Sequence, residues 1–354
     1  MSNVVILTGS VQSGKTTTLL RHFSNKKGVG GFICPDVNGR RMMFFPSENR
    51  LMEFQITTTD SSINVGKFSF DELIFKKAFD LINTAAQSNN DYFIIDEVGP
   101  LELKQQGYYD ALVTLFENAK NNTSLTILLV VRDYLVDKVI EKFNLSGVKV
   151  ITKEELPIDA NSRLGCNGVI LTGGESSRMK SDKFLLKYDG VEQYKRLHYF
   201  FNEMGLPNFL SCNHNQFSNE ELSIDKIKDD LNYKDAGPLT GILSAFDQLQ
   251  SDLLIVGCDY PQLKKEHIQM LKQFSEYGFD EIAFVKNDRA DVVEPLICFL
   301  SKKSLEKLKS FYINGGRSLN EYLQQVNPVK IQLKDDSFLR SFDTPEDYQS
   351  YYNN

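Results

Sequence analysis

The stretch from Gly9 to Thr16, Gly-Ser-Val-Gln-Ser-Gly-Lys-Thr, constrains this chain most, because it fits the phosphate-binding pattern G-x-x-x-x-G-K-[ST]. It follows an apolar strand-like run, residues 3–8, and precedes a stretch that reads as a helix. The glycines let successive backbone N–H groups face one anion, and the helix N-terminus adds positive potential. A glycine-rich turn with a surface lysine is the weaker interpretation. Lys15 is expected to reach the outer phosphates and Thr16 to bind Mg²⁺. The predicted nucleotide contacts are Gly9, Ser10, Gln12, Ser13, Gly14, Lys15, Thr16 and Thr17.

A pair of carboxylates follows a second apolar run. Asp96 ends the run Tyr92-Phe-Ile-Ile, and Glu97 comes directly after it. A phosphate loop needs a second protein group on its metal ion, and an aspartate at the end of a strand supplies it. The pair would otherwise cap a strand and begin a turn, an interpretation that the phosphate loop disfavours. We therefore predict that Asp96 binds the metal and that Glu97 is catalytic, orienting the water that attacks the γ-phosphate.

An apolar, strand-like run that leads directly into a glycine occurs twice in the chain. Residues 3–8 run into Gly9, and residues 167–172 run into Gly173. The stretch between the two halves is polar, with Pro157 and no periodic apolar face, as is typical of a linker. A length of 354 residues suits two domains. The prediction is a domain at 1–150, a linker at 151–165 and a second domain at 166–354.

Short apolar runs alternate with helical patterns in both halves. This alternation favours the α/β class, with a mostly parallel sheet flanked by helices in each domain. The expected strands are 3–8, 92–96, 125–131, 167–172, 208–212, 252–258 and 281–285, and the expected helices include 70–86 and 304–311.

Charge and cysteine usage exclude several classes of protein. The chain has 40 Lys and Arg against 47 Asp and Glu, a net charge of -7, which disfavours nucleic acid or an anionic membrane as the partner. The apolar run at 125–131 is far shorter than the ~20 residues of a membrane helix. The N-terminal run lacks a basic leader and reads as a strand rather than a signal peptide. The 5 cysteines are scattered and form no C-x-x-C pair, so we expect no disulfide framework or zinc site and a reducing, cytoplasmic location.

The second glycine turn opens a longer pattern, Leu-Thr-Gly-Gly-Glu-Ser-Ser-Arg-Met-Lys-Ser-Asp-Lys, at 171–183. Two glycines allow a nucleotide to lie against backbone N–H groups. Two cations follow where the β- and γ-phosphates would lie, and nucleotidyl transfer accumulates charge there as pyrophosphate leaves. A Gly-Gly turn before a solvated basic helix is the disfavoured alternative. The predicted nucleotide contacts are Leu171, Thr172, Gly173, Gly174 and Ser176, and the predicted catalytic residues are Arg178 and Lys183.

A carboxylate also ends an apolar strand in the second half. Asp259 follows the run 252–258 and precedes Tyr-Pro. At the carboxyl end of a buried strand, a side chain faces the ligand crevice of an open sheet. There it can hold Mg²⁺ against the α-phosphate, so we assign Asp259 to the metal and to catalysis. The alternative is a strand-end cap.

The first half resembles the small THEP-type nucleoside triphosphatases. The matching pieces are residues 9–17, 31–35, 65–67, 96–103 and 130–132, of which Asp-Glu-Val-Gly-Pro-Leu-Glu-Leu at 96–103 is the most distinctive. The resemblance implies a P-loop fold, magnesium-dependent nucleoside triphosphate binding, slow hydrolysis and a loose base preference. No guanine-reading Asn-Lys-x-Asp string occurs in the sequence, so the base stays open.

The second half, from residue 166 to about 350, resembles the MobA-type nucleotidyltransferases, the molybdenum cofactor guanylyltransferases and their near relatives. Matches continue after the Gly-Gly pattern at 237–242, 258–261, 294–296, 315–318 and 343–347. The resemblance implies a Rossmann-like fold. It also implies that Asn213 contacts the base or ribose, that Asp230 and Gly237 lie at the nucleotide, and that Lys183 is closer than Arg178 to the transferred phosphate. Asp230 is preferred over the adjacent Asp229 because of its spacing to Gly237.

The sequence departs from the family pattern mainly at the acceptor end. Lys180 stands where a glycine often follows Arg-Met, Glu294 where many members have His, and Ser341 and Asp343 where two asparagines are usual. The last two departures make the identity of the acceptor less certain than the nucleotide chemistry.

Three hypotheses follow. The first is a Mg²⁺-dependent enzyme that transfers GMP from GTP to molybdopterin, with ATP as a further candidate nucleotide. The second is a related transferase with another nucleotide or acceptor, cytidylyl or sugar-phosphate. The third treats the first half as a nucleotide-gated adaptor. The oligomeric state is open.

Overall fold

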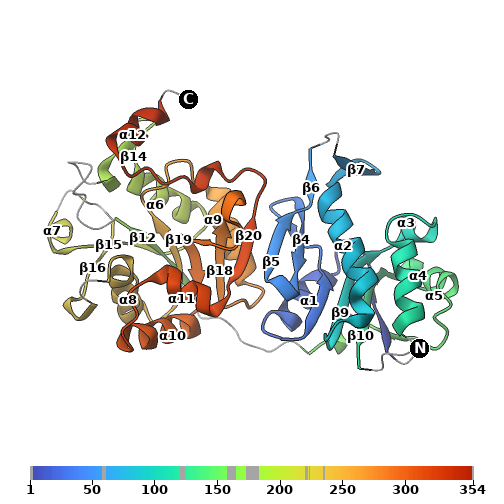
Figure 1. Ribbon diagram of the computed structural model, residues 1–354. Coiled ribbons are helices and arrows are strands. Elements are labelled where there is room, and N and C mark those ends of the chain that lie inside the picture. Colours follow the sequence, from blue (N-terminus) through green and yellow to red (C-terminus); the bar gives the residue numbers. More distant parts are fainter. Residues whose placement is uncertain are drawn as a thin grey trace. The chain divides into compact units, whose positions relative to one another are not determined.

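The computed structural model describes residues 3–57, 61–119, 124–157, 165–172, 183–219, 222, 224–233 and 236–352. The chain forms two compact units, Met1–Asn161 and Ser162–Asn354 (Figure 1). The beginning of the stretch that we expected to be a linker packs on the first unit. Strand β11, Lys149–Ile151, pairs with the first strand, and a 3-10 turn, Lys153–Glu155, follows it.

The first unit is built on a five-stranded sheet in the order β11-β1-β10-β9-β2. Every pairing in this sheet is parallel. Strand β10 lies between β1, which carries the phosphate loop, and β9, which carries Asp96. The bounds of the other four strands are β1 (Val4–Gly9), β2 (Val29–Phe32), β9 (Tyr92–Val98) and β10 (Thr126–Arg132).

Short antiparallel strands and five helices among the described residues complete this unit. Strand β4 (Arg40–Phe45) pairs with both β3 (Asp36–Val37) and β5 (Arg50–Glu53). Strand β8 (Phe68–Asp71) pairs with β6 (Gln55–Ile56) and β7 (Ser62–Val65). The helices are α1 (Lys15–Phe23), α2 (Glu72–Thr84), α3 (Pro100–Leu103), α4 (Tyr109–Asn118) and α5 (Val136–Lys142).

Both faces of the parallel sheet are covered. Phe93 and Ile95 of β9 pack with side chains of α2 and α4, which lie side by side in Figure 1. Ile94, which alternates with them, is buried as well. Burial on both faces explains why these strands read as continuous apolar runs rather than as alternating ones.

The second unit has its own sheet, in the order β16-β15-β12-β17-β19-β18-β20. The pairings on either side of β12 are parallel, whereas β19 is antiparallel to both of its neighbours. The strands are β12 (Cys166–Leu171), β15 (Asn208–Cys212), β16 (Lys226–Lys228), β17 (Asp252–Gly257), β18 (Glu281–Val285), β19 (Val293–Leu300) and β20 (Val329–Gln332).

Helices flank this sheet on both faces. Helices α8, α10 and α11 share one core with Val169 and Ile255, while α6 and α9 contact each other and the sheet. The bounds are α6 (Gln193–Glu203), α7 (His214–Phe217), α8 (Pro238–Leu249), α9 (Lys265–Ser275), α10 (Lys302–Ile313), α11 (Leu319–Val326) and α12 (Pro345–Tyr351). The predicted α/β class with mostly parallel sheets is confirmed.

The last helix closes over a small hairpin. Helix α12 lies beside the hairpin of β13 (Lys187–Tyr188) and β14 (Val191–Glu192) in Figure 1. The hydroxyls of Tyr348 and Tyr352 donate to the carbonyl of Lys187 at 2.9 and 2.7 Å. The chain's last helix therefore holds the hairpin that follows the 171–183 pattern. Within the described ranges, no helix is long and apolar enough to cross a membrane.

A buried histidine makes the stability of the second unit depend on pH. His267 of α9 stacks on Phe338 at 3.7 Å between ring centroids, and its Nδ1 accepts a hydrogen bond from the backbone N–H of Lys264 at 3.1 Å. Burial, with the charge of Lys264 second, lowers the pKa of His267 to about 4. The unfolded chain binds this proton near pH 6.5, so the unfolded state holds more protons between the two values.

Stability conferred by the neutral ring should therefore be complete above pH 6.5 and be lost as the pH falls towards 4. The expected loss of unfolding free energy is roughly 3 kcal/mol. Denaturant unfolding of wild type and His267→Gln from pH 7 to 4 measures it, since glutamine keeps the acceptor of the helix cap. Exposed His214→Gln is the matched control, and equal pH slopes for wild type and His267→Gln would contradict the assignment.

Candidate functional site

The phosphate loop connects β1 to α1 through left-handed backbone. Gln12 has φ 60° and Gly14, the residue before the helix, has φ 90°. Gly9 has φ 155°, which side chains rarely adopt, and a Cβ there would lie 2.9 Å from the Ser13 hydroxyl oxygen, so this close turn favours glycine. The helix begins at Lys15, and the first backbone bond runs from the N–H of Thr18 to the carbonyl of Gly14 at 2.9 Å. The N-terminal N–H groups of α1 therefore face the loop.

Lys15 lies across this loop. Its Nζ donates to the carbonyls of Gly9 and Ser10 at 2.8 and 2.7 Å and to the hydroxyl of Ser13 at 3.3 Å. Burial lowers the pKa of Lys15, while the charge of Asp96 opposes this shift. The loop oxygens thus hold the Lys15 ammonium in place. A bound phosphate group can take over as the hydrogen-bond partner of this ammonium.

Asp96 is brought to the loop from the far side of β10. Its Oδ2 accepts hydrogen bonds from the Thr16 hydroxyl at 3.1 Å and from the Cys34 N–H at 2.9 Å. Its Oδ1 is buried and has no hydrogen-bond partner among the residues that the structure describes. Burial, with the charge of Glu97 second, raises the pKa of Asp96 to about 6.

These donor atoms fit a divalent cation. A buried carboxylate oxygen without a partner, beside a hydroxyl, is the arrangement that Mg²⁺ completes together with substrate phosphate oxygens. In the described part of the chain, no three His, Cys, Asp or Glu side chains are grouped to hold a metal by themselves.

Glu97 adopts the left-handed region with φ 67°, which is uncommon outside glycine and asparagine. Its carboxylate forms an ion pair with the guanidinium of Arg41 from β4, and its side chain is 46% exposed. The adjacent carboxylate of Asp96 is buried instead. The two adjacent carboxylates thus face different surroundings.

All of these groups line one cavity of about 810 Å³ in the first unit. Phosphate-loop residues and charged groups form part of its wall, and aromatic rings of the antiparallel strands and α2 form another part. The lining residues that matter for the argument are Lys15, Thr16, Arg41, Asp96, Glu97 and Arg132, and the rings are Phe54, Phe68, Phe70 and Phe75.

Two further cationic side chains lie at the loop, and the sequence did not predict either of them as a site residue. Arg132 ends β10 in register with Gly9 of β1. Lys153, in the turn after β11, donates its Nζ to the carbonyl of Ser13 at 2.7 Å. Arg132 lay within a matched segment, whereas Lys153 and Arg41 carried no signal in the sequence.

In the second unit, Leu171, Asn213 and Asp259 lie at or just after the carboxyl ends of three neighbouring strands. Leu171, the last residue of β12, is in register with Ser211 of β15 and with Gly257 of β17. The chain moves outward from β12 to β15 and β16 and returns on the other side of β12 as β17. Such a reversal of strand order opens the ligand crevice of a doubly wound sheet.

Two predicted nucleotide contacts make internal hydrogen bonds. The buried Thr172 hydroxyl lies 2.7 Å from the Ser211 carbonyl and 2.8 Å from the Gln216 side-chain oxygen. Asn213 caps α7, its Oδ1 accepting from the Gln216 N–H at 2.9 Å. These contacts fasten β12 to β15 beside the crevice, so the structure gives both residues a positioning contact.

The loop before α8 contains the remaining predicted contacts of this wall. Gly237, with φ 54°, precedes Pro238 at the start of the helix. Asp230 has its backbone N–H bonded to the Ser244 hydroxyl at 2.8 Å. Its neighbour Asp229 accepts a hydrogen bond from the Ser211 hydroxyl at 3.2 Å, and burial raises the pKa of Asp229. Asp229 is therefore the aspartate tied to the strand ends.

Asp259 follows the end of β17, and its carbonyl accepts the N–H of Phe342 at 2.8 Å. The C-terminal segment thus runs beside the position predicted for the metal. Glu294 of β19 accepts a hydrogen bond from the buried Tyr260 hydroxyl and lies 3.7 Å from the Nζ of Lys286. Glu294 thus has both a tyrosine hydroxyl and a lysine as partners, at the start of β19.

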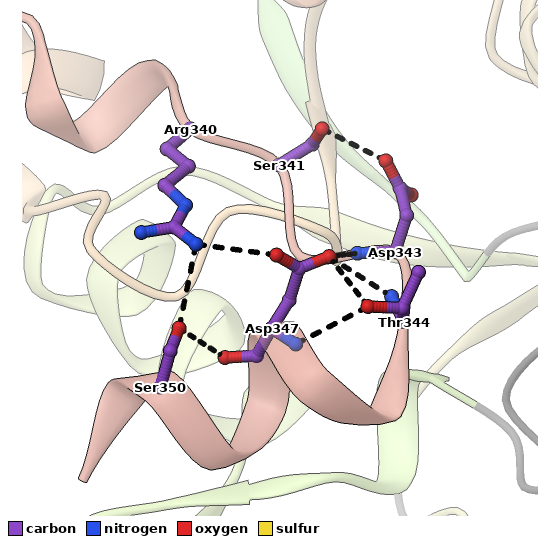
Figure 2. Close-up of polar contacts among 6 residues, drawn as sticks. All are labelled: Arg340, Ser341, Asp343, Thr344, Asp347 and Ser350. Carbon is purple, nitrogen blue, oxygen red and sulfur yellow. Dashed lines mark hydrogen bonds and ion pairs between the residues drawn. The ribbon is translucent and has the colours of Figure 1, made fainter. Parts of the chain in front are cut away.

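Figure 2 shows what the C-terminal Thr-Pro-Glu-Asp segment does. The Oδ2 of Asp347 accepts from the N–H groups of Asp343 and Thr344, both at 3.1 Å, and the Thr344 hydroxyl caps the N–H of Asp347 at 3.2 Å. Arg340 pairs with Asp347 at 3.2 Å, and the Ser341 hydroxyl donates to Asp343 at 2.9 Å. This capping network begins α12 and fixes the segment beside Asp259.

Several predicted residues lie outside the described part of the structure. They are Gly173, Gly174, Ser176 and Arg178, together with the side chain of Lys183. The backbone of Lys183 begins a 3-10 turn, Lys183–Leu185, that leads into the β13–β14 hairpin.

Two family models match this chain. Residues 4–159 match the family described as NTPase, and residues 168–329 match the MobA-like NTP transferase domain. The chain joins a THEP-type NTPase domain to a MobA-like nucleotidyltransferase domain. The resemblance of each half that was seen in the sequence is thereby confirmed.

Comparison with known proteins found the following similarities. The probable molybdenum cofactor guanylyltransferase of Bacillus mycoides is 27% identical over 176 residues, which are 48% of this chain and 85% of that protein. Molybdopterin-guanine dinucleotide biosynthesis protein A from Archaeoglobus fulgidus aligns with 53% of this chain and 97% of its own, at 18% identity and a TM-score of 0.43. THEP1 from Aquifex aeolicus aligns with 42% of this chain and 88% of its own, at 20% identity and a TM-score of 0.32.

Proposed function

We propose that the second domain transfers GMP from GTP to the phosphate of molybdopterin and releases pyrophosphate. An oxygen of the acceptor phosphate attacks the α-phosphorus, and the bond from that phosphorus to the β-bridging oxygen breaks. The acceptor is already an anion, so the reaction needs positioning and charge stabilisation rather than a strong base. Arg178 and Lys183 would stabilise the charge that develops on the triphosphate.

The observation that carries this proposal is the switch point at β12. In the sequence the Gly-Gly pattern follows β12, and Asp259 follows the adjacent β17, on the side where the strand order reverses. A nucleotide in this crevice would lie between the two. The acceptor class is taken from the name of the Bacillus mycoides relative, a probable molybdenum cofactor guanylyltransferase, which aligns along 85% of its length.

We further propose that both domains use Mg²⁺. Thr16 and Asp96 would hold it in the NTPase domain and Asp259 in the transferase domain. The ion would supply charge neutralisation on the phosphates. In the first domain, Glu97 would orient the attacking water and Lys15 would bind the outer phosphates.

The test is a screen with the full-length chain and Mg²⁺. Pyrophosphate is measured directly, because the NTPase domain releases orthophosphate. We expect pyrophosphate only when GTP and molybdopterin are both present. Release with CTP, or with a sugar 1-phosphate in place of molybdopterin, would contradict the proposal. The choice of acceptor is tested because Glu294 and Asp343, two positions that depart from the family pattern, are carboxylates whose charges act on the Tyr260 hydroxyl.

A further inference from the structure

Arg41 reaches the phosphate loop's cavity from a part of the chain outside every matched motif. It lies on β4, in the antiparallel strands that follow β2. Its Nη1 donates to the carbonyl of Cys34 at 3.2 Å and forms the ion pair with Glu97. Within the described ranges, Nε and Nη2 of Arg41 have no hydrogen-bond partner. A guanidinium with two unpaired donors therefore faces the cavity that contains Lys15 and Asp96.

The partner of Arg41 is the residue predicted to orient the attacking water. While Arg41 holds the Glu97 carboxylate, that carboxylate is occupied by a cation instead of a water molecule. The pair is half-exposed, with side-chain exposures of 29% for Arg41 and 46% for Glu97, so breaking it costs little. A terminal phosphate offers two or more oxygens in the geometry that a guanidinium fork matches.

We propose that Arg41 is a catalytic residue of the NTPase domain that exchanges Glu97 for the terminal phosphate of the bound nucleoside triphosphate. The exchange puts the free Nε and Nη2 donors on the γ-phosphate and releases Glu97 to orient water. The role belongs to the chain itself, in the manner of an arginine supplied in cis.

The chemical step balances with water alone. The water oxygen attacks the γ-phosphorus, the bond from that phosphorus to the β-bridging oxygen breaks, and the nucleoside diphosphate leaves with that oxygen. Glu97 takes part in removing the water proton, which ends on orthophosphate or solvent. Arg41 stabilises the charge that spreads over the γ-phosphate oxygens in the transition state.

The exchange predicts a pattern that a merely structural ion pair would not produce. In Arg41→Gln, kcat for hydrolysis should fall at least ~10²-fold. The affinity for Mg²⁺–β,γ-imido-ATP should fall several-fold, whereas the affinity for Mg²⁺–ADP, which lacks the γ-phosphate, should not change. Glu97→Gln removes the competing carboxylate, so it should tighten imido-ATP binding, and Arg41→Gln/Glu97→Gln should lose that gain.

Adenine probes are chosen because the transferase domain is proposed to bind GTP. Calorimetry on the full-length chain measures each affinity, and Lys15→Ala identifies which binding event belongs to the phosphate loop. The matched control is Arg40→Gln, because Arg40 is the adjacent residue, is 69% exposed, pairs with Glu53 and does not line the cavity. Arg40→Gln should behave as wild type in every assay.

Arg41→Lys separates charge from geometry and guards against a folding defect of Arg41→Gln. It should keep the fold and a cation but lose the fork, so its kcat should lie well below wild type. An unchanged preference for imido-ATP over ADP in Arg41→Gln, or hydrolysis by Arg41→Lys within threefold of wild type, would overturn the proposal.

Discussion

Lys15→Ala is expected to lower nucleoside triphosphate hydrolysis by at least ~10²-fold while nucleotidyl transfer continues at the wild-type rate. The Nζ of Lys15 has only loop carbonyls and the Ser13 hydroxyl as partners within 3.3 Å among the described residues, so its contacts serve the loop. The predicted transferase residues all lie in the other compact unit. Orthophosphate and pyrophosphate release by one preparation measure both activities.

The transferase domain supplies the internal control for this variant. Transfer at the wild-type rate shows that the chain is folded, and Lys76→Ala, whose side chain is 71% exposed beside Asp80, controls for loss of a positive charge. Loss of both activities in a folded Lys15→Ala protein would contradict the independence of the two modules. That result would instead indicate that the phosphate loop controls transfer.

The parts of the fold that the sequence predicted are those encoded locally. The strands β1, β9 and β12 were found because each is a buried apolar run that meets a glycine or a carboxylate, although β9 continues two residues past Asp96 to Val98. Helix α2 was expected at 70–86 and is Glu72–Thr84, where Asp71 caps the first turn at 2.9 Å from the N–H of Ile74. Short-range periodicity and end signals decide such elements.

The antiparallel direction of β19 had no local signal. The strand itself was not among those expected, because Glu294 and Pro295 stand at its start and only 296–300 is a continuous apolar run, flanked by strands on both sides. Direction depends on how the chain returns to the sheet, which involves residues far apart in the sequence. Fold class was therefore predictable, whereas strand order was not.

The same distinction applies to the candidate sites. The phosphate loop and Asp96 were identified because each lies in a spaced pattern with a chemical requirement. The pairing of Arg41 with Glu97 joins residues 56 positions apart, and that of Lys153 with Ser13 joins residues 140 positions apart. A lone lysine or arginine in a polar stretch gives no indication of such a partner. The choice of Asp230 rested on spacing, which cannot indicate that Asp229 contacts the end of β15.

Asp259→Ala is expected to abolish pyrophosphate release from GTP and acceptor, while hydrolysis by the NTPase domain stays at the wild-type rate. Asp259 is proposed as the carboxylate that holds Mg²⁺ against the α-phosphate. Removing one group that stabilises developing charge costs ~10²–10³ in rate, and loss of a metal ligand adds to that. Its backbone carbonyl, not its side chain, accepts the Phe342 N–H, so that link to the C-terminal segment survives the substitution.

Asp259→Asn tests the charge with almost no change in shape, and it should lose transfer as Asp259→Ala does. Raising Mg²⁺ should restore part of the Asp259→Asn activity, since an amide oxygen is a weaker ligand for the same ion. Asp288→Ala, a 68% exposed aspartate of the same unit, should leave both activities unchanged. Wild-type transfer by Asp259→Ala at low Mg²⁺ would show that the metal is held elsewhere. Asp229, which is tied to the Ser211 hydroxyl at the end of β15, would then be the next carboxylate to replace.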